Sequence, residues 1–211
     1  MTRQERAERT RRVILDAAAA AIDERGYNAA SVSEILAKAG VTKGALYFHY
    51  SSKEELAQAL IESQFSIELF DSDESTSNGL QQVIDISHEM ARALLTDVRV
   101  RAGMRLVAES NFANPMPEPY RKWIASMRTH LEVAKTRGDL RESIDPEKVA
   151  TWVIGCYLGI QSMSDVLTGR ADLHDRLTDF WTIALPGLVP PRRISRFVPS
   201  GTIPLAGVAT A

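Results

Sequence analysis

Several features are scarce in this sequence, and each absence excludes a class of protein. The single cysteine, Cys156, excludes an internal disulfide and a multi-cysteine metal site. The longest nearly apolar run, residues 152–160, has nine residues, whereas a membrane span needs about 20. Nine prolines and twelve glycines are too few for a disordered or fibrous chain. We therefore expect an ordered cytoplasmic protein without a membrane anchor, in which Cys156 is a buried thiol.

The signatures of enzymes are also missing. No histidine pairs with a carboxylate at a metal-ligand spacing, and the sequence contains no glycine-rich phosphate loop. The acidic stretch at residues 71–74 lacks the glycine and the distal glutamate of a calcium loop, so we interpret it as a solvated linker. The sequence thus predicts no catalytic residue, no metal and no cofactor, and a small helical enzyme stays only as a distant alternative.

Charge is distributed unevenly along the chain. The formal net charge of −2 argues against a protein that coats nucleic acid. Residues 1–12, however, carry five arginines against two glutamates, and residues 1–55 carry nine basic against eight acidic side chains. The remaining residues carry 16 basic against 19 acidic side chains. A basic lead-in attached to a mildly acidic body fits a DNA-reading module joined to another domain.

Apolar residues recur with a period near 3.6 throughout, and no alternating strand pattern appears, so the fold class is all-α. Capping residues, glycines and prolines then bound the individual helices. The predicted ranges are 7–25, 31–39, 43–50, 52–71, 80–96, 99–111, 119–137, 146–168 and 171–185.

The most informative segment is residues 31–50, which has the pattern of a helix-turn-helix. A short amphipathic helix, which Ser31 or Ser33 can cap, is followed by the corner Gly40-Val41-Thr42 and by a second helix of about two turns. Such a unit places its second helix in the major groove of DNA. An aromatic-rich helix packed in a core is the alternative, but a helix this short offers little area for a core.

At about 100° per residue, the second helix has one side that we expect to face DNA. That side carries Lys43, Gly44, Tyr47 and Phe48, and Lys53 follows in a position suited to a phosphate contact. The complete set of predicted DNA-binding residues is Ser31, Ser33, Thr42, Lys43, Gly44, Ala45, Tyr47, Phe48, His49 and Lys53.

These residues carry a family resemblance. Arg25-Gly-Tyr, Ser33-Glu-Ile-Leu and Gly40-Val-Thr-Lys-Gly-Ala-Leu-Tyr-Phe-His-Tyr-Ser-Ser-Lys-Glu-Glu-Leu56 resemble the TetR family of repressors. Residues 41–49, together with residues 101–106 and Trp123, resemble its γ-butyrolactone receptor subfamily from actinomycetes. The likeness is strongest through residue 60.

The resemblance implies a homodimer that reads a palindromic operator in double-stranded DNA and does not associate with membranes. It implies a helix-turn-helix domain at residues 1–52, a ligand-binding and dimerisation domain at 53–189 and a flexible tail at 190–211. Helices 146–168 and 171–185 would form an intersubunit four-helix bundle through two apolar stripes; the alternative is that they pack only within one subunit. The stripes comprise Val149, Trp152, Val153, Cys156, Tyr157 and Ile160, and Phe180, Trp181 and Leu185.

The effector implied by the resemblance is an uncharged γ-butyrolactone, which requires a mostly apolar pocket with a few hydrogen-bond donors. Trp123 matches the tryptophan of the family pocket, and the other candidates are Met104, Val107, Met127 and Gln161. The predicted function is repression of secondary-metabolism genes, released by the lactone. A regulator of the same fold that responds to an antibiotic or a biosynthetic intermediate is the alternative.

Overall fold

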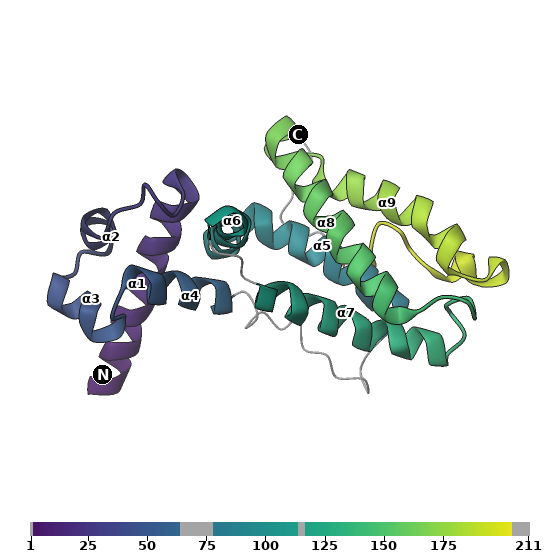
Figure 1. Cartoon of the computed structure of the whole chain (residues 1–211), viewed down its shortest axis with the longest axis horizontal. Helices are drawn as coiled ribbons and strands as arrows, with labels where there is room; N and C mark the ends of the chain where they lie inside the picture. Colours follow the sequence, from purple (N-terminus) through teal and green to yellow (C-terminus); the bar gives the residue numbers. More distant parts are fainter. Residues whose placement is uncertain (1, 64–77, 114–116, 204–211) are drawn as a thin grey trace. The chain divides into compact units, whose positions relative to one another are not determined.

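The structure is a computed structural model that describes residues 2–63, 78–113 and 117–203, with the side chains of residues 110–113 excepted. Within those ranges the chain is helical and contains no strand, which confirms the all-α prediction (Figure 1). None of the described helices is long and apolar enough to cross a membrane. The chain divides into two compact units, Met1–Glu68 with Thr96–Pro119 and Leu69–Leu95 with Tyr120–Ala211.

The first unit contains α1 (Arg3–Arg25), α2 (Val32–Ala39), α3 (Lys43–His49), α4 (Lys53–Ser63) and α6 (Val98–Ala113). Its core is formed by apolar side chains of the first four helices. Helix α6 packs against both α1 and α4, although it is distant from them in sequence. Fully buried members of this core are Ile14, Ala18, Ile22, Ile35, Leu46, Leu56 and Leu60.

Helix α1 begins four residues earlier than the predicted start at residue 7, because its N-terminus carries a capping box. The Thr2 hydroxyl accepts from the Glu5 amide at 3.2 Å, and the Glu5 carboxylate accepts from the Thr2 amide at 2.6 Å. The helix ends at Gly26, whose φ of +80° lies in the region that favours glycine. The basic lead-in is therefore the exposed first half of a helix.

The second unit contains α5 (Leu80–Thr96), most of α7 (Pro117–Thr136), α8 (Pro146–Thr168), α9 (Leu173–Leu188) and the 3-10 helix η3 (Pro191–Arg196). Helices α8 and α9 pack against each other as an antiparallel pair (Figure 1). The predicted bounds 80–96 and 146–168 agree with α5 and α8. Fully buried Trp181 anchors the core of this unit, and its indole donates to the Ser87 hydroxyl at 2.9 Å.

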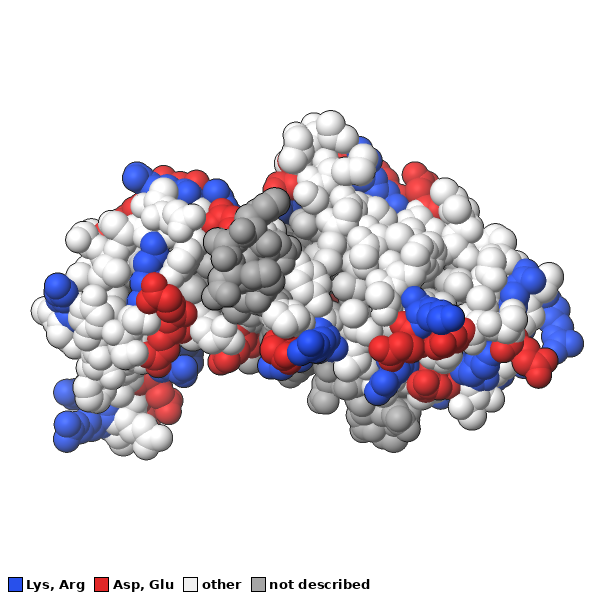
Figure 2. Space-filling view, in the orientation of Figure 1, with Lys and Arg blue, Asp and Glu red and all other residues white. Residues whose placement is uncertain are grey.

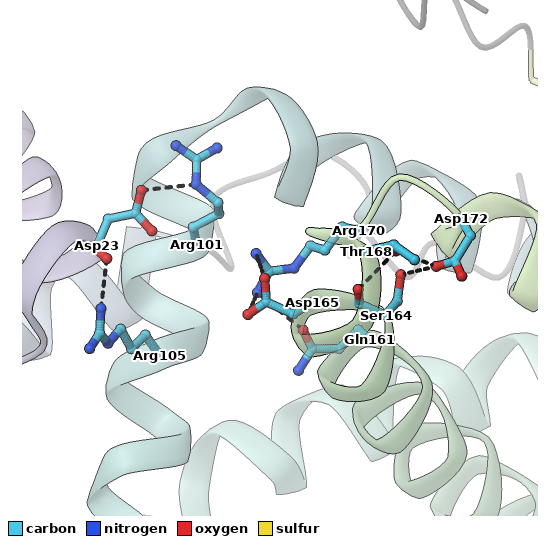
Figure 3. A network of polar contacts seen from close by, with 9 residues as sticks. All are labelled: Asp23, Arg101, Arg105, Gln161, Ser164, Asp165, Thr168, Arg170 and Asp172. Atoms are coloured by element: carbon cyan, nitrogen blue, oxygen red, sulfur yellow. Dashed lines mark hydrogen bonds and ion pairs between the residues drawn. The ribbon is translucent and has the colours of Figure 1, made fainter. Parts of the chain in front are cut away.

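The turn between α8 and α9 is fixed by side chains of both helices (Figure 3). Gly169 ends α8 with φ +61°, and Arg170 also has a positive φ, +68°. The Asp172 carboxylate accepts from the Ser164 hydroxyl at 2.6 Å and the Thr168 hydroxyl at 2.8 Å. The Arg176 guanidinium, together with these hydrogen bonds, holds the pKa of Asp172 well below its usual range.

Residues 190–203 of the segment predicted as a flexible tail have a defined structure, and residues 204–211 lie outside the described residues. Helix α9 continues past the predicted end at residue 185, through Pro186 to Leu188, and η3 follows. Residues 197–203 then lie along α5, where the Gln81 side chain both donates to and accepts from the backbone of Val198. Prolines make this segment irregular, but hydrogen bonds from α5 hold it in place. The predicted linker at residues 71–74 and the end of the helix predicted at 52–71 lie outside the described residues.

Candidate functional site

The corner between α2 and α3 is fixed by three short-range interactions. The Ser31 hydroxyl accepts from the Glu34 amide at 3.1 Å and caps α2. Gly40 ends α2 in the left-handed conformation, with φ +64°. The Thr42 hydroxyl accepts from the Ala45 amide at 3.2 Å and caps α3. Ser31, rather than Ser33, is therefore the cap, and the direction of α3 is set by residues within the motif itself.

The face of α3 that we predict to contact DNA is exposed. Lys43 and Gly44 are exposed, and Tyr47 and Phe48 retain 42% and 77% of their accessible surface. The Lys43 ammonium lies 5.8 Å from the centre of the Tyr47 ring. Monomeric proteins seldom expose large apolar side chains side by side without a binding role. The exposure of Tyr47 and Phe48 therefore contradicts the alternative that α3 is merely a core helix.

The opposite side of α3 holds it to the rest of the unit. Leu46 is buried in the core, and Tyr50, just after the helix, is also buried, with its hydroxyl 3.5 Å from the Arg11 carbonyl. Burial raises the pKa of Tyr50. Ala45 and His49 are half-buried at the edge of the exposed face, whereas Ser33 is exposed on α2. Helical geometry thus assigns the two sides of α3 correctly.

Lys53 has a partner that the sequence did not indicate. Its ammonium donates to the carbonyl of Tyr27 and lies 4.3 Å from the centre of the Tyr27 ring. The Tyr27 hydroxyl donates to Glu54 at 3.2 Å, and burial together with this carboxylate raises the pKa of Tyr27. Lys53 therefore fastens α4 to the turn after α1. A phosphate contact by Lys53 stays a prediction and would use its other N–H groups.

A row of polar contacts joins α6 to α1 and the turn after it (Figure 3). The Arg101 guanidinium donates to the Asp23 carboxylate at 2.9 Å, and Arg105 donates to the Asp23 carbonyl at 2.7 Å. The Glu109 carboxylate accepts from the Tyr27 amide at 2.8 Å and from Arg105 at 2.7 Å. We call this set the α1–α6 polar contact. It fixes α6 to the helix on which α2 and α3 pack.

All five predicted ligand-contacting residues are buried, in two different units. Met104 and Val107 belong to α6 in the first unit. Trp123 and Met127 lie one turn apart on α7, and Gln161 lies on α8, all in the second unit. The Gln161 side chain accepts from Arg170 at 3.5 Å (Figure 3). The ligand role of each stays a prediction.

Two buried hydroxyl groups in the second unit were not among the predicted ligand residues. Within the part of the chain that the structure describes, Tyr157 Oη and Ser126 Oγ have no hydrogen-bond partner. Burial raises the pKa of Tyr157. Such groups cost free energy unless another molecule satisfies them, so both are candidate ligand contacts. Tyr157 stands one turn before Gln161, and this spacing is the signal that could have identified it.

The apolar residues of α8 and α9 divide into a buried and an exposed set. Val149, Val153, Tyr157, Trp181 and Leu185 are buried within the unit, so they cannot form the predicted intersubunit stripe. The exposed set retains Trp152 of that stripe and adds Met163, Val166, Leu167 and Ile183. Val166 and Ile183 retain 82% and 80% of their accessible surface. We call this second set the α8–α9 apolar face.

Three further observations describe this region. The surface over α8 and α9 in Figure 2 is mostly uncharged. A groove of about 550 Å³ lies beside Trp152, Phe180 and Ile183. Cys156, which we expected to be buried, is half-buried on α8.

Comparison with known proteins gives consistent matches. Residues 14–60 match the family model described as bacterial regulatory proteins, tetR family, and residues 77–190 match the tetracyclin repressor-like C-terminal domain. The A-factor receptor protein of Streptomyces griseus is 40% identical over 209 residues, which cover 99% of this chain and 74% of the relative.

Solved structures agree with these matches. A γ-butyrolactone receptor described as ArpA-like has a TM-score of 0.73 at 35% identity, covering 92% of this chain and 95% of its own. CprB from Streptomyces coelicolor, solved with its biological operator sequence, has a TM-score of 0.70 at 37% identity, covering 92% and 94%. This chain therefore belongs to the TetR family of bacterial regulatory proteins.

Proposed function

We propose that the protein is a homodimeric repressor that leaves a palindromic operator when it binds a γ-butyrolactone-type effector, and that it controls secondary metabolism. The observation that carries the DNA-binding part is the exposed lysine and aromatic face of α3, on a corner fixed by its own caps. The effector class rests on similarity to the A-factor receptor and to the γ-butyrolactone receptor. Membership of a family of regulators favours this role over catalysis.

The α3 face offers complementary contacts to DNA. The Lys43 ammonium can donate to a guanine edge or to a phosphate, and exposed Gly44 allows close approach of the backbone. The Tyr47 hydroxyl can reach a phosphate, and its ring and that of Phe48 can pack against sugars or thymine methyl groups. In a dimer, two such helices would enter major grooves about 34 Å apart.

Replacing Lys43 with Ala should weaken operator binding by about 1–3 kcal/mol and relax base preference if the ammonium reads a base. Fluorescence anisotropy on the operator and on single-base variants of it would measure both effects. The matched control is Lys122→Ala, which removes an exposed lysine from α7 and should not change affinity. Normal operator affinity in the double variant Lys43→Ala, Tyr47→Ala would exclude this reading face.

The α8–α9 apolar face provides the surface for the dimer. Ile183, Val166 and Leu167 are large, apolar and mostly exposed in one chain. Burying them against a second copy would remove this apolar surface from water. Glycines at 155 and 159 of α8 lie in open space, where a neighbouring helix could approach closely.

Ile183→Glu should break the dimer, because it places an unpaired carboxylate in an apolar interface. Sedimentation velocity should show monomers, and operator affinity should fall because each monomer reads only one half-site. The control Thr136→Glu adds the same charge at an exposed position on α7 outside this face. A dimer that persists in Ile183→Glu at micromolar concentration would place the interface elsewhere.

The buried groups of the second unit suit an effector with an apolar body and hydrogen-bond acceptors. Trp123 and Met127 offer apolar surface on α7, and Tyr157 and Ser126 offer hydroxyl donors that lack an acceptor in the described residues. Donors of this kind match the carbonyl of a lactone. A regulator that binds an antibiotic or a biosynthetic intermediate is the second candidate, and the same donors could serve it.

A thermal-shift panel of butyrolactones, butenolides and antibiotics should identify the effector, because a ligand at about 100 times its Kd stabilises the protein by about 2.7 kcal/mol. Trp123→Ala should abolish that shift. Tyr157→Phe should lower affinity by about 0.5–1.5 kcal/mol through loss of one hydrogen bond. The control Thr136→Val removes an exposed hydroxyl and should leave the shift unchanged. An unaltered shift in both Trp123→Ala and Tyr157→Phe would disprove this site.

Within the first unit, the α1–α6 polar contact joins α6 to the DNA-binding helices. Met104 and Val107 lie on α6. The same helix contacts the Asp23 carboxylate and the Tyr27 amide. An effector that contacts α6 would therefore act on a helix fixed to α1 by charge-assisted hydrogen bonds. Displacement of α6 would move α1, and α2 and α3 with it, because these helices share one core.

Arg101→Gln should reduce the coupling between effector and operator, whereas it should change the affinity for either one alone much less. Coupling free energies are typically 1–3 kcal/mol, and loss of the ion pair should remove a measurable part of that. Operator titrations with and without effector give the coupling directly. Arg128→Gln, which breaks the Arg128–Glu147 ion pair in the second unit, is the matched control. Full effector response in Arg101→Gln would show that this ion pair transmits nothing.

A further inference from the structure

A buried histidine, a half-buried histidine and residues 197–203 meet at one point in the second unit. His88 on α5 and His174 at the start of α9 lie with their Nδ1 atoms 3.2 Å apart and their rings 3° from parallel. His88 Nε2 lies 2.9 Å from the carbonyl oxygen of Pro199. Pro199 belongs to residues 197–203, which we call the C-terminal segment. One imidazole pair therefore joins three segments that are far apart in sequence.

Hydrogen-bond chemistry fixes where the protons are. A carbonyl oxygen only accepts, so His88 Nε2 must carry a hydrogen, and in neutral His88 the Nδ1 atom is then an acceptor. His174 must accordingly donate from its own Nδ1. This leaves His174 Nε2 as a buried lone pair, and it has no partner among the described residues. When both rings are neutral, each of the two hydrogen bonds has one donor and one acceptor.

An additional proton has no suitable position in this pair. On His88 Nδ1 it would bring two N–H groups together across 3.2 Å, and on His174 Nε2 it would create a buried donor without an acceptor. A tautomer change in His174 relieves the first conflict only by producing the second. Either protonation therefore costs the hydrogen bond between the rings or leaves a buried donor unsatisfied.

The charged groups around the pair are few. On α5, Asp85 faces His88, and Glu89 and Arg92 face His174 as an ion pair. On α9, Asp175 is the neighbouring charge. From residues 197–203, the polar groups that reach the cluster are the Pro199 carbonyl and Thr202, and Thr202 donates to both oxygens of Asp85, at 2.7 Å each. Burial disfavours the charged imidazolium form more than the neighbouring carboxylates favour it, so the pKa of both histidines is lowered.

We propose that His88, His174 and the Pro199 carbonyl form a proton-controlled latch, which holds residues 197–203 on α5 when both rings are neutral and releases them when either ring is protonated. The segment also closes tightly over the pair, because a Cβ at Gly201 would lie 3.2 Å from the His88 ring. Release would uncover α5 and free the start of α9.

The sign of the pH effect follows from the depressed pKa values. The folded state binds fewer protons than the unfolded chain between the folded pKa and the ordinary value of 6.5. The latch contributes its full stability above pH 6.5 and loses it as the pH falls through that window. Each pKa unit of depression corresponds to a tenfold preference for the closed form.

Hydrogen exchange on the full-length protein tests the latch. Protection of residues 197–203, corrected for the intrinsic pH dependence of exchange, should fall about tenfold or more between pH 7.5 and pH 5.5. Long-range ¹⁵N–¹H spectra at pH 7.5 should show His88 with hydrogen on Nε2 and His174 with hydrogen on Nδ1. Equal protection at both pH values, or the opposite tautomers, would overturn the proposal.

Variants separate a proton-controlled latch from a purely structural contact. In His174→Asn the amide cannot be protonated, and it can present either an N–H or, after a flip, its carbonyl oxygen to His88 Nδ1. Protonation of His88 then causes no conflict between two N–H groups, so the segment should stay protected at both pH values. His88→Ala should remove the protection of residues 197–203 at both pH values. The control His130→Gln removes another buried histidine, one outside this cluster, and should retain the pH dependence. A pH-dependent loss of protection that persists in His174→Asn would refute titration of the pair as the cause.

Discussion

The attachment of α6 to α1 is the interaction on which the proposed regulation depends. Arg101, Arg105 and Glu109 make one charged contact with Asp23 and two contacts with backbone groups, one near the end of α1 and one in the turn after it. Ionic hydrogen bonds to backbone atoms fix position as well as charge, because a backbone group cannot rotate away. The helix that carries Met104 and Val107 thus forms a single body with the DNA-binding helices.

The same unit shows how a short recognition helix is kept rigid. Helix α3 has seven residues, too few to be stable alone in water. The Thr42 cap, the burial of Leu46 and the burial of Tyr50 supply the stability that its length does not. Lys43, Tyr47 and Phe48 are consequently left on a fixed surface, where little conformational entropy is lost on binding.

In the second unit, α8 has one buried apolar face and one exposed apolar face. One face contributes Val149 and Val153 to the core, and another exposes Val166 and Leu167. Between them, Tyr157 carries a hydroxyl into a region where it finds no acceptor within the described chain. The helix thereby serves the fold, the proposed dimer and the proposed effector site. The C-terminal segment adds a further constraint, since its place on α5 depends on the protonation of two histidines.

The sequence by itself determined the helix-turn-helix and most helix bounds. These features depend on local interactions, namely a Ser31 or Thr42 cap, a glycine at a positive φ and a period of 3.6 residues. Local rules also identified the exposed side of α3, because the directions of side chains follow from helical geometry alone.

Only the tertiary structure decided which apolar side chains meet. Periodicity places Val153 and Val166 on the same long helix but does not say which of them a neighbouring helix covers. It could not show that α6 joins the first unit, that Lys53 contacts Tyr27, or that a proline-rich end lies on α5. Each of these contacts joins residues distant in the chain, and they are selected by the free energy of burial and pairing over the whole fold.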